Sequence, residues 1–383
     1  MKNSKYNHIF LVIFAVFILL SASYILFIHK TNYLEIFVVY YKPAPLIKND
    51  IFTPIQGGRA IQNTSSRKGT FTSEEINWLN NNMIGDDTGE NISQLNRYFA
   101  EITALYWIYK NTTSPFVGMF QYRRFLAINP NTIYPTITYP SMRFHHLGIK
   151  HLDGFSKKFL RNLELEKKFI LPFFATHDIL LSEPIKLNSY EQYKEEHHIS
   201  DLNKALDIIK QKYPHMYDFA IQELNSENGF YPTNMFVTRR QILNDYANWL
   251  FSILLPLYDE IKDEVAMRDT EQKLAFAYLS ERLFTVYFRY QQKYHHLRIK
   301  ELPFALASDF FTPAPQSSYI KLKTPTFEDI FVKQGEDRIC GFNNPYRFCG
   351  FFKITPPNRL QIKWDNGPTE FFTYKNNLFE LEN

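Results

Sequence analysis

The stretch from residue 85 to residue 126 constrains the fold more than any other part of this chain. It begins with adjacent carboxylates in a glycine-flanked turn, Asp86 and Asp87. Over residues 95–110 the apolar and aromatic residues recur at three- and four-residue spacing, which indicates a helix. Residues 116–120 (FVGMF) then form a short, continuously apolar run, which predicts a strand buried on both faces. A turn, a helix and a buried strand in this order favour an open α/β sheet.

Polar residues flank this predicted helix–strand unit. Asn91 is expected to cap the helix, because its side-chain oxygen can accept a backbone N–H, and Gln94 completes a capping box. The strand delivers a polar and cationic group at its carboxyl end, which consists of Gln121, Tyr122, Arg123 and Arg124. Ligands of open α/β sheets lie beyond the carboxyl ends of the strands, so a binding site is predicted there.

These motifs resemble a bacterial family of glycosyltransferase-like proteins from capsule, exopolysaccharide and lipopolysaccharide gene clusters, known as the domain of unknown function DUF4422. The family pattern runs Asp-Asp-x-Gly-x-Asn-Ile-Ser, then Glu-(Leu/Ile)-Thr-Ala-x-Tyr-Trp, then a strand ending His-Tyr-Arg-Arg-Tyr. Residues 86–93, 101–107 and 121–125 match these three motifs. Gln121 replaces the histidine, and an amide cannot titrate near neutral pH, so proton transfer is not expected at this position.

The resemblance implies a GT-A-like (Rossmann-like) α/β fold, with a mixed sheet flanked by helices, over residues 34–306. Two further regions are predicted from the sequence itself. Residues 1–30 are expected to be an N-terminal membrane anchor. Residues 315–383 contain short alternating aromatic and β-branched runs separated by turn signals, which predicts a small all-β module.

The membrane prediction rests on residues 9–28, which carry no charge and have the length, roughly 20 residues, that crosses a bilayer core as a helix. A cleaved signal peptide is the competing interpretation, because residues 21–23 are small enough for a cleavage site. The apolar run continues past that point, so an uncleaved single-pass anchor is favoured. The side of the membrane stays open, because the flanking charges differ too little.

Charge and cysteine content narrow the function classes. The formal net charge is +4, and no basic cluster is dense enough to predict nucleic-acid binding. The two cysteines, Cys340 and Cys349, lack the spacing of a zinc site. A disulfide between them and two free thiols both remain open.

A second group of candidate residues follows later in the chain. Asn234 immediately precedes an apolar strand predicted from Met235 to Thr238, and the run resembles the family's Asn-Met-Phe-(Ile/Val), where a polar side chain would lie under the transferred sugar. A turn asparagine that satisfies the backbone is the alternative. Glu281 matches the family's (Ala/Ser)-Glu-Arg-Leu and is a candidate general base or sugar-hydroxyl acceptor. A structural Glu281–Arg282 pair is the alternative for this residue.

Sugar transfer from a nucleotide sugar sets the expected chemistry. The departing diphosphate gains negative charge, so cations must face it, and Arg123 and Arg124 are predicted to do so. An ordinary surface ion pair is the alternative for this arginine pair. Asp86 and Asp87 are then expected to bind the donor sugar or a divalent ion, Mn²⁺ or Mg²⁺. The predicted catalytic residues are Asp86, Asp87 and Glu281, and the predicted substrate-binding residues are Thr88, Asn91, Glu101, Gln121, Tyr122, Arg123, Arg124, Asn234 and Met235.

The function that the resemblance implies is transfer of a sugar, of the hexosyltransferase type, from a nucleotide-sugar donor to a glycan or lipid-linked acceptor in surface polysaccharide synthesis. The alternative is a non-catalytic, membrane-tethered carbohydrate-binding protein that uses the aromatic β-module. A phosphotransferase is less favoured, because the sequence has no glycine-rich phosphate loop.

Overall fold

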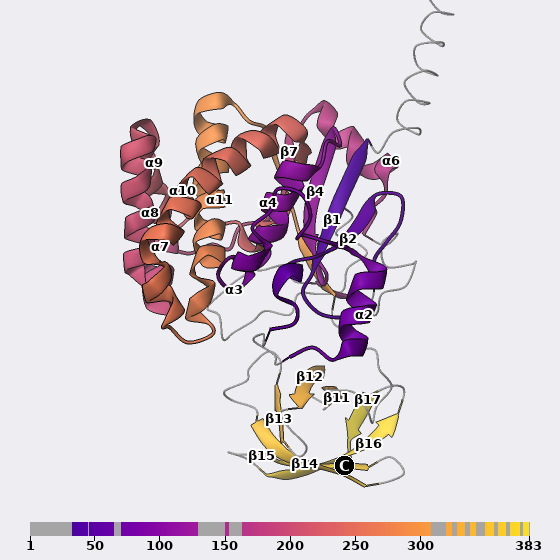
Figure 1. Ribbon diagram of the computed structural model, residues 1–383. Helices are drawn as coiled ribbons and strands as arrows, with labels where there is room; N and C mark the ends of the chain where they lie inside the picture. Colours follow the sequence, from indigo (N-terminus) through magenta and orange to yellow (C-terminus); the bar gives the residue numbers. More distant parts are fainter. Residues whose placement is uncertain are drawn as a thin grey trace, which may run out of the picture.

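The computed structural model describes most of the chain (Figure 1). The described residues are 33–44, 46–64, 70–128, 150–152, 163–307, 319–323, 328–333, 338–341, 349–355, 359–364, 368–375 and 378–382.

A mixed sheet forms the centre of the larger part of the molecule. Four parallel strands lie side by side in the order β3 (Ile84–Gly85), β2 (Phe52–Gln56), β1 (Leu34–Tyr40) and β4 (Phe116–Gln121). The predicted buried strand is confirmed as β4, and β1 beside it is also almost entirely buried. The further strands of this sheet are β5 (Arg124–Leu126), β6 (Lys150–Leu152), β7 (Ile179–Ser182), β8 (Phe236–Arg239), β9 (Ile299–Leu302) and β10 (Phe304–Ala307).

The strand order reverses at β1. The chain runs outward from β1 to β2 and β3, and then crosses back to place β4 on the other side of β1. Val39 of β1 lies opposite Gln121 of β4, so the carboxyl ends of these two strands meet. A crevice opens at such a switch point in open α/β sheets, and ligands bind there.

Both faces of the sheet are covered, because successive side chains of a strand point to opposite faces. Phe37 and Val39 join one apolar cluster, and Ile36 and Val38 join the other. The first cluster packs against the helices gathered on one side in Figure 1, and the second includes side chains of α2 and α6. The helices are α2 (Ser73–Asn82), α3 (Asn96–Phe99), α4 (Ile102–Asn111), α6 (Lys167–Ile170), α7 (Ser189–Glu196), α8 (Ile199–Lys212), α9 (Pro214–Leu224), α10 (Arg240–Ala266) and α11 (Ala275–His295). Short 3₁₀ helices lie at η1 (Arg59–Ile61), η2 (Ser93–Leu95), η5 (Leu171–Ala175), η6 (Pro232–Asn234) and η7 (Gln272–Leu274).

The helix predicted over residues 95–110 is broken at Ala100. There the backbone has φ 45° and ψ −127°, between the end of α3 and the start of α4. The side-chain amide of Asn96 donates to the carbonyl of Ala100 at 2.7 Å, and this bond holds the break. Local apolar spacing cannot reveal such a break, because the contact that holds it is polar. The break turns the following residue, Glu101, toward the carboxyl end of the sheet.

We expect Ala100→Gly to raise the free energy of unfolding by about 1 kcal/mol. A positive φ in this region costs an alanine about 1–3 kcal/mol, and glycine avoids that cost while losing about 0.5–1 kcal/mol through its freer unfolded chain. Ala104→Gly is the matched control, because Ala104 is buried within α4. It should lower stability by about 1 kcal/mol. Urea unfolding of both variants measures the difference, and equal losses in the two would contradict strain at Ala100.

The C-terminal strands form a separate sheet. They are β11 (Tyr319–Lys323), β12 (Glu328–Lys333), β13 (Arg338–Gly341), β14 (Cys349–Thr355), β15 (Arg359–Trp364), β16 (Thr369–Lys375) and β17 (Leu378–Leu381). Consecutive strands pair antiparallel, and β17 pairs with β11 so that the sheet closes on itself. The predicted all-β character of this region is therefore confirmed. Cys340 and Cys349 occupy opposite positions on β13 and β14.

The predicted N-terminal transmembrane helix is corrected. Among the residues that the structure describes, no helix is both long enough and apolar enough to cross a membrane. The predicted localisation as a single-pass membrane protein therefore has no support in the structure. Residues 9–28, on which that prediction rested, lie outside the described residues.

Candidate functional site

A cleft of about 740 Å³ opens at the carboxyl ends of β1, β2 and β4. Its lining comes from the end of β1, the turn after β2 with η1, Phe71, the α3–α4 break, the end of β4 with the segment after it, and residues 270–281 on and before α11. A cleft of this size can hold a ligand as large as a nucleotide sugar.

One group of cleft residues is cationic. Arg123 and Arg124 line the cleft, as do Arg97 and Lys273. The guanidinium of Arg123 lies 5.7 Å from the centre of the Tyr122 ring. The cleft is therefore suited to an anionic group, because guanidinium groups bind phosphate oxygens in a fork.

Arg124 belongs to a second, inner group. Its Nη1 donates to Oε1 of Gln121. Burial lowers the pKa of Arg124, and the neighbouring charge of Arg123 lowers it further, whereas Glu101 and Glu281 act in the opposite direction. The acids that face Arg124 are thus Glu101 and Glu281, and not the predicted pair Asp86 and Asp87.

Glu101 lines the cleft directly after the break at Ala100. Its Oε1 accepts hydrogen bonds from Asn234 Nδ2 at 3.2 Å and from Gln121 Nε2 at 3.4 Å. Burial, and then the negative charge of Glu281, raise the pKa of Glu101 from 4.5 to about 7. A carboxylate with a pKa near neutrality can take a proton from a hydroxyl group and later release it.

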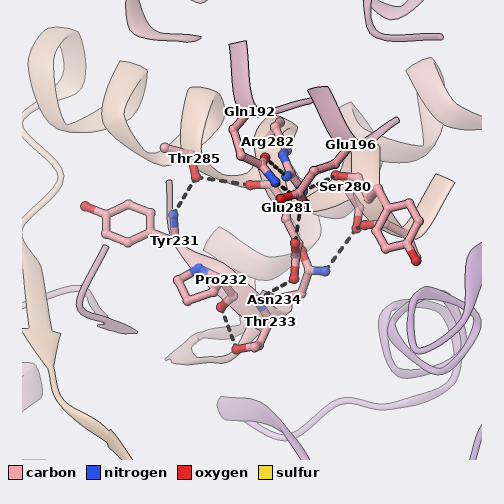
Figure 2. A network of polar contacts seen from close by, with 12 residues as sticks. Gln192, Glu196, Tyr231, Pro232, Thr233, Asn234, Ser280, Glu281, Arg282 and Thr285 are labelled. Atoms are coloured by element: carbon pink, nitrogen blue, oxygen red, sulfur yellow. Dashed lines mark hydrogen bonds and ion pairs between the residues drawn. The ribbon is translucent and has the colours of Figure 1, made fainter. Parts of the chain in front are cut away.

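Glu281 of α11 is held from two sides (Figure 2). Its Oε1 accepts the backbone N–H of Thr233 at 2.7 Å, and its Oε2 pairs with Arg282 at 3.1 Å. Arg282 is buried, with its guanidinium 4.2 Å from the centre of the Phe230 ring. The structural ion pair and the cleft-lining position, which the sequence left as alternatives, are both present at Glu281.

The turn that contacts Glu281 is strained. Thr233 and Asn234 both have positive φ, 75° and 51°, which is uncommon for residues other than glycine. Asn234 Nδ2 also donates to Ser280 Oγ at 3.0 Å, and Ser280 Oγ in turn donates to a backbone carbonyl, so the orientation of the amide is fixed (Figure 2). Asn234 is fully buried, and its Oδ1 has no hydrogen-bond partner among the described residues. Asn234 therefore supports Glu101 from behind, while Met235 beside it lies in the apolar core.

The acidic turn is placed differently from the prediction. Asp86 is fully buried, whereas Asp87 and Thr88 are exposed. Asn91 accepts the N–H of Ser93 and donates to carbonyls of its own turn, so it organises this turn and does not form the predicted capping box. The residues that line the cleft do not include Asp86, Asp87, Thr88 or Asn91.

The predicted metal site has no matching group of ligands. Within the described part of the chain, no three His, Cys, Asp or Glu side chains are placed to hold an ion. Both oxygens of Asp86 are occupied by four protein donors: the N–H groups of Gly58 and Arg59 and the hydroxyls of Ser93 and Thr103. A carboxylate has about four acceptor positions, so Asp86 has none left for a metal or a sugar.

Sequence reasoning missed several residues of the cleft. Lys273 and Tyr278 reach it from η7 and α11, where no motif distinguishes them from other helix-spaced residues. Tyr41 directly follows β1, and its position at a strand end was the available signal. Gly57 and Gly58 in the turn after β2 also line the cleft.

Comparisons with known proteins agree with this geometry. The family model described as "Domain of unknown function (DUF4422)" matches residues 35–293, which is most of the chain. The apo structure of the bifunctional glycosyltransferase WbbM is similar, with 28% sequence identity and a TM-score of 0.59 over 76% of this chain and 49% of that one. The present chain thus spans about half the length of that protein. No curated protein matches the chain. The mixed α/β fold is therefore GT-A-like, as the resemblance implied.

Proposed function

The chain belongs to the DUF4422 family, and from this premise we propose that it is a glycosyltransferase acting on a nucleotide-sugar donor. The observation that carries the proposal is one cleft, at the switch point of the sheet, that holds both a cationic group and two carboxylates, Glu101 and Glu281. We further propose that a hexose is the sugar and that the acceptor is a glycan or lipid-linked hydroxyl in surface polysaccharide synthesis.

The cationic group provides the electrostatic part of this chemistry. The bond between the sugar and the diphosphate breaks during transfer, and negative charge grows on the departing phosphate. Arg123 is proposed to face that phosphate, with a further contribution from Lys273, which also lines the cleft. Arg124, which is bonded to Gln121, is proposed to balance the charge of the two carboxylates.

The carboxylates provide the acid–base and recognition part. Glu101 is proposed to take the proton of the acceptor hydroxyl, because its pKa of about 7 suits proton transfer near neutral pH. Glu281 is proposed to accept a hydrogen bond from a hydroxyl of the donor sugar, because Thr233 and Arg282 hold it in a fixed position.

Within the described part of the chain, no group of three or more His, Cys, Asp or Glu side chains offers Mn²⁺ or Mg²⁺ a site. The oxygens of Asp86 are occupied, Asp87 is exposed outside the cleft, and Arg124 lies beside both cleft carboxylates. The proposed charge stabilisation therefore assigns the departing phosphate to guanidinium and ammonium groups.

A donor-panel assay tests the proposed function. The full chain is incubated with UDP- and GDP-sugars, with and without Mn²⁺ or Mg²⁺, and nucleotide release and the thermal midpoint are measured. We expect at least one donor to raise the midpoint and to be hydrolysed slowly without an acceptor, also in the presence of EDTA. If no nucleotide sugar changes either quantity, the proposed function is wrong.

Arg123→Ala should weaken donor binding about ten- to a hundredfold. A hydrogen bond to a charged group contributes about 1.5–3 kcal/mol, and alanine cannot replace it. Arg123→Lys should recover part of the loss, because ammonium keeps the charge without the planar fork. Arg359→Ala, on β15 of the C-terminal sheet, is the control for removal of a surface arginine. Calorimetric titration with the donor found in the panel measures all three, and equal affinity of Arg123→Ala and wild type would remove Arg123 from the site.

A further inference from the structure

The turn after β2 has the shape of an anion-binding loop, but its N–H groups are already used. Gly58 has φ 73° and ψ 28°, and successive N–H groups next to a left-handed residue form a concave nest that favours an anion. The N–H of Gly57 donates to the carbonyl of Tyr40 at 2.8 Å, and the N–H of Ala60 donates to Ser93 Oγ at 3.1 Å. The two N–H groups between them donate to Asp86, at 2.9 and 3.1 Å.

Asp86 is therefore the anion in this nest. It is fully buried, and an ionised carboxylate is stable in such a place only when its oxygens are hydrogen-bonded. Its four donors come from three separate parts of the chain: the turn after β2, Ser93 of η2 and Thr103 of α4. Burial raises the pKa of Asp86, while these four hydrogen bonds act against that rise.

The same carboxylate is connected to the break that presents Glu101. Thr103 Oγ1, which donates to Asp86, also accepts Asn96 Nδ2 at 2.9 Å. Asn96 Nδ2 in turn donates to the carbonyl of Ala100 at 2.7 Å. A continuous set of hydrogen bonds thus runs from one wall of the cleft to the other through Asp86.

We infer that Asp86 is a positioning residue that fills the anion nest of the Gly57–Ala60 turn from inside the protein. Asp86 holds the Gly57–Ala60 turn, which forms one wall of the cleft, in a fixed position relative to the Ala100 break. Because the N–H groups of this turn are occupied by Asp86, the donor's diphosphate is recognised by side chains and not by these backbone N–H groups. The kinetic part of this inference rests on the proposed function, whereas its structural part does not. A phosphate in the nest would have to displace Asp86 from four donors.

Chemical rescue tests the inference. Asp86→Ala leaves four donors around a space the size of a small carboxylate, so formate should bind there. We expect the thermal midpoint of Asp86→Ala to fall by about 5 °C or more. Formate should restore it in a saturable way, while chloride at equal ionic strength should not. Donor KM should rise at least tenfold in the variant and return toward the wild-type value with formate.

Two further variants keep the test decisive. Asp87→Ala is the matched control, because Asp87 is adjacent and exposed, and formate should change neither its midpoint nor its KM. Asp86→Asn keeps the shape of the side chain but turns one acceptor into a donor, so its donor KM should also rise at least tenfold, with no response to formate.

The inference is overturned if Asp86→Asn behaves like wild type, or if formate stabilises Asp86→Ala no more than Asp87→Ala. If Asp86→Ala does not fold even in formate, Asp86→Asn alone decides. Should wild type act on no donor, the proposed function fails, and the midpoints still report on Asp86.

Discussion

Glu101→Gln is expected to lower kcat by about 10²–10⁴-fold, the usual contribution of a positioned general base. Glutamine keeps the size of the side chain and can still accept the hydrogen bond from Asn234 on its oxygen. It cannot take a proton, so the loss should fall on kcat, while donor KM should stay within about threefold of the wild-type value.

The pH dependence of wild-type activity is an independent test of the role of Glu101. A base acts only when it is ionised, and burial together with the charge of Glu281 raises the pKa of Glu101 to about 7. The kcat/KM of wild type, which reports the ionisation of the free enzyme, should therefore increase with pH through about 7 and level off above it. In Glu101→Gln this limb should be absent, because no group at this position titrates.

Stability measurements show whether Glu101→Gln loses activity through the lost base or through misfolding. The folded-state pKa of Glu101 is raised above the ordinary 4.5, so ionising this residue costs stability as the pH rises from about 4.5 to about 7. Glutamine does not carry this cost, and Glu101→Gln should be at least as stable as wild type at pH 8. Glu90→Gln, on an exposed side chain outside the cleft, should keep full kcat. A Glu101→Gln variant that keeps more than about a tenth of kcat would exclude Glu101 as the base.

The elements of the sheet were predictable because their signals are local. β1 and β4 are continuous apolar runs, and such runs are typical of strands buried on both faces. In α10, too, the buried apolar residues recur at helical spacing, which is a local signal. The break at Ala100 was not predictable in this way, because its backbone is set by Asn96 and by residues distant in sequence.

The candidate site likewise contains residues that local sequence patterns could predict and residues that they could not. Gln121, Arg123 and Arg124 were predicted near a ligand from their place after a buried strand, and the structure puts them in the cleft. Asp86 was predicted, with Asp87, to bind the donor sugar or a divalent ion, but it is fully buried. Its burial depends on donors supplied by residues up to 28 positions away, and no local pattern shows them.

Arg268→Ala should lower the free energy of unfolding by about 3–5 kcal/mol. Arg268 and Asp201 of α8 form a two-pronged ion pair, with N–O distances of 2.6 and 2.9 Å. Their side chains are only 6% and 2% exposed, so removal of the arginine leaves a buried carboxylate without its partner. Lys262→Ala is the control, because Lys262 and Asp259 are paired on the surface, where such a pair contributes less than about 1 kcal/mol.

The Arg268–Asp201 ion pair lies next to a segment that lines the cleft, so its loss should affect donor binding as well as stability. Arg268 directly precedes the segment in which Thr270 and Lys273 line the cleft, and Glu264 of α10 holds it from the other side at 2.6 Å. Loss of the pair should therefore also weaken donor binding, although neither residue of the pair lines the cleft. The double variant Asp201→Leu with Arg268→Met removes both charges, and replacement of a buried pair by apolar side chains is often nearly neutral. We expect the double variant to unfold at a higher urea concentration than Arg268→Ala. If it is less stable than that single variant, the charge left behind at Asp201 is not the cause of the loss.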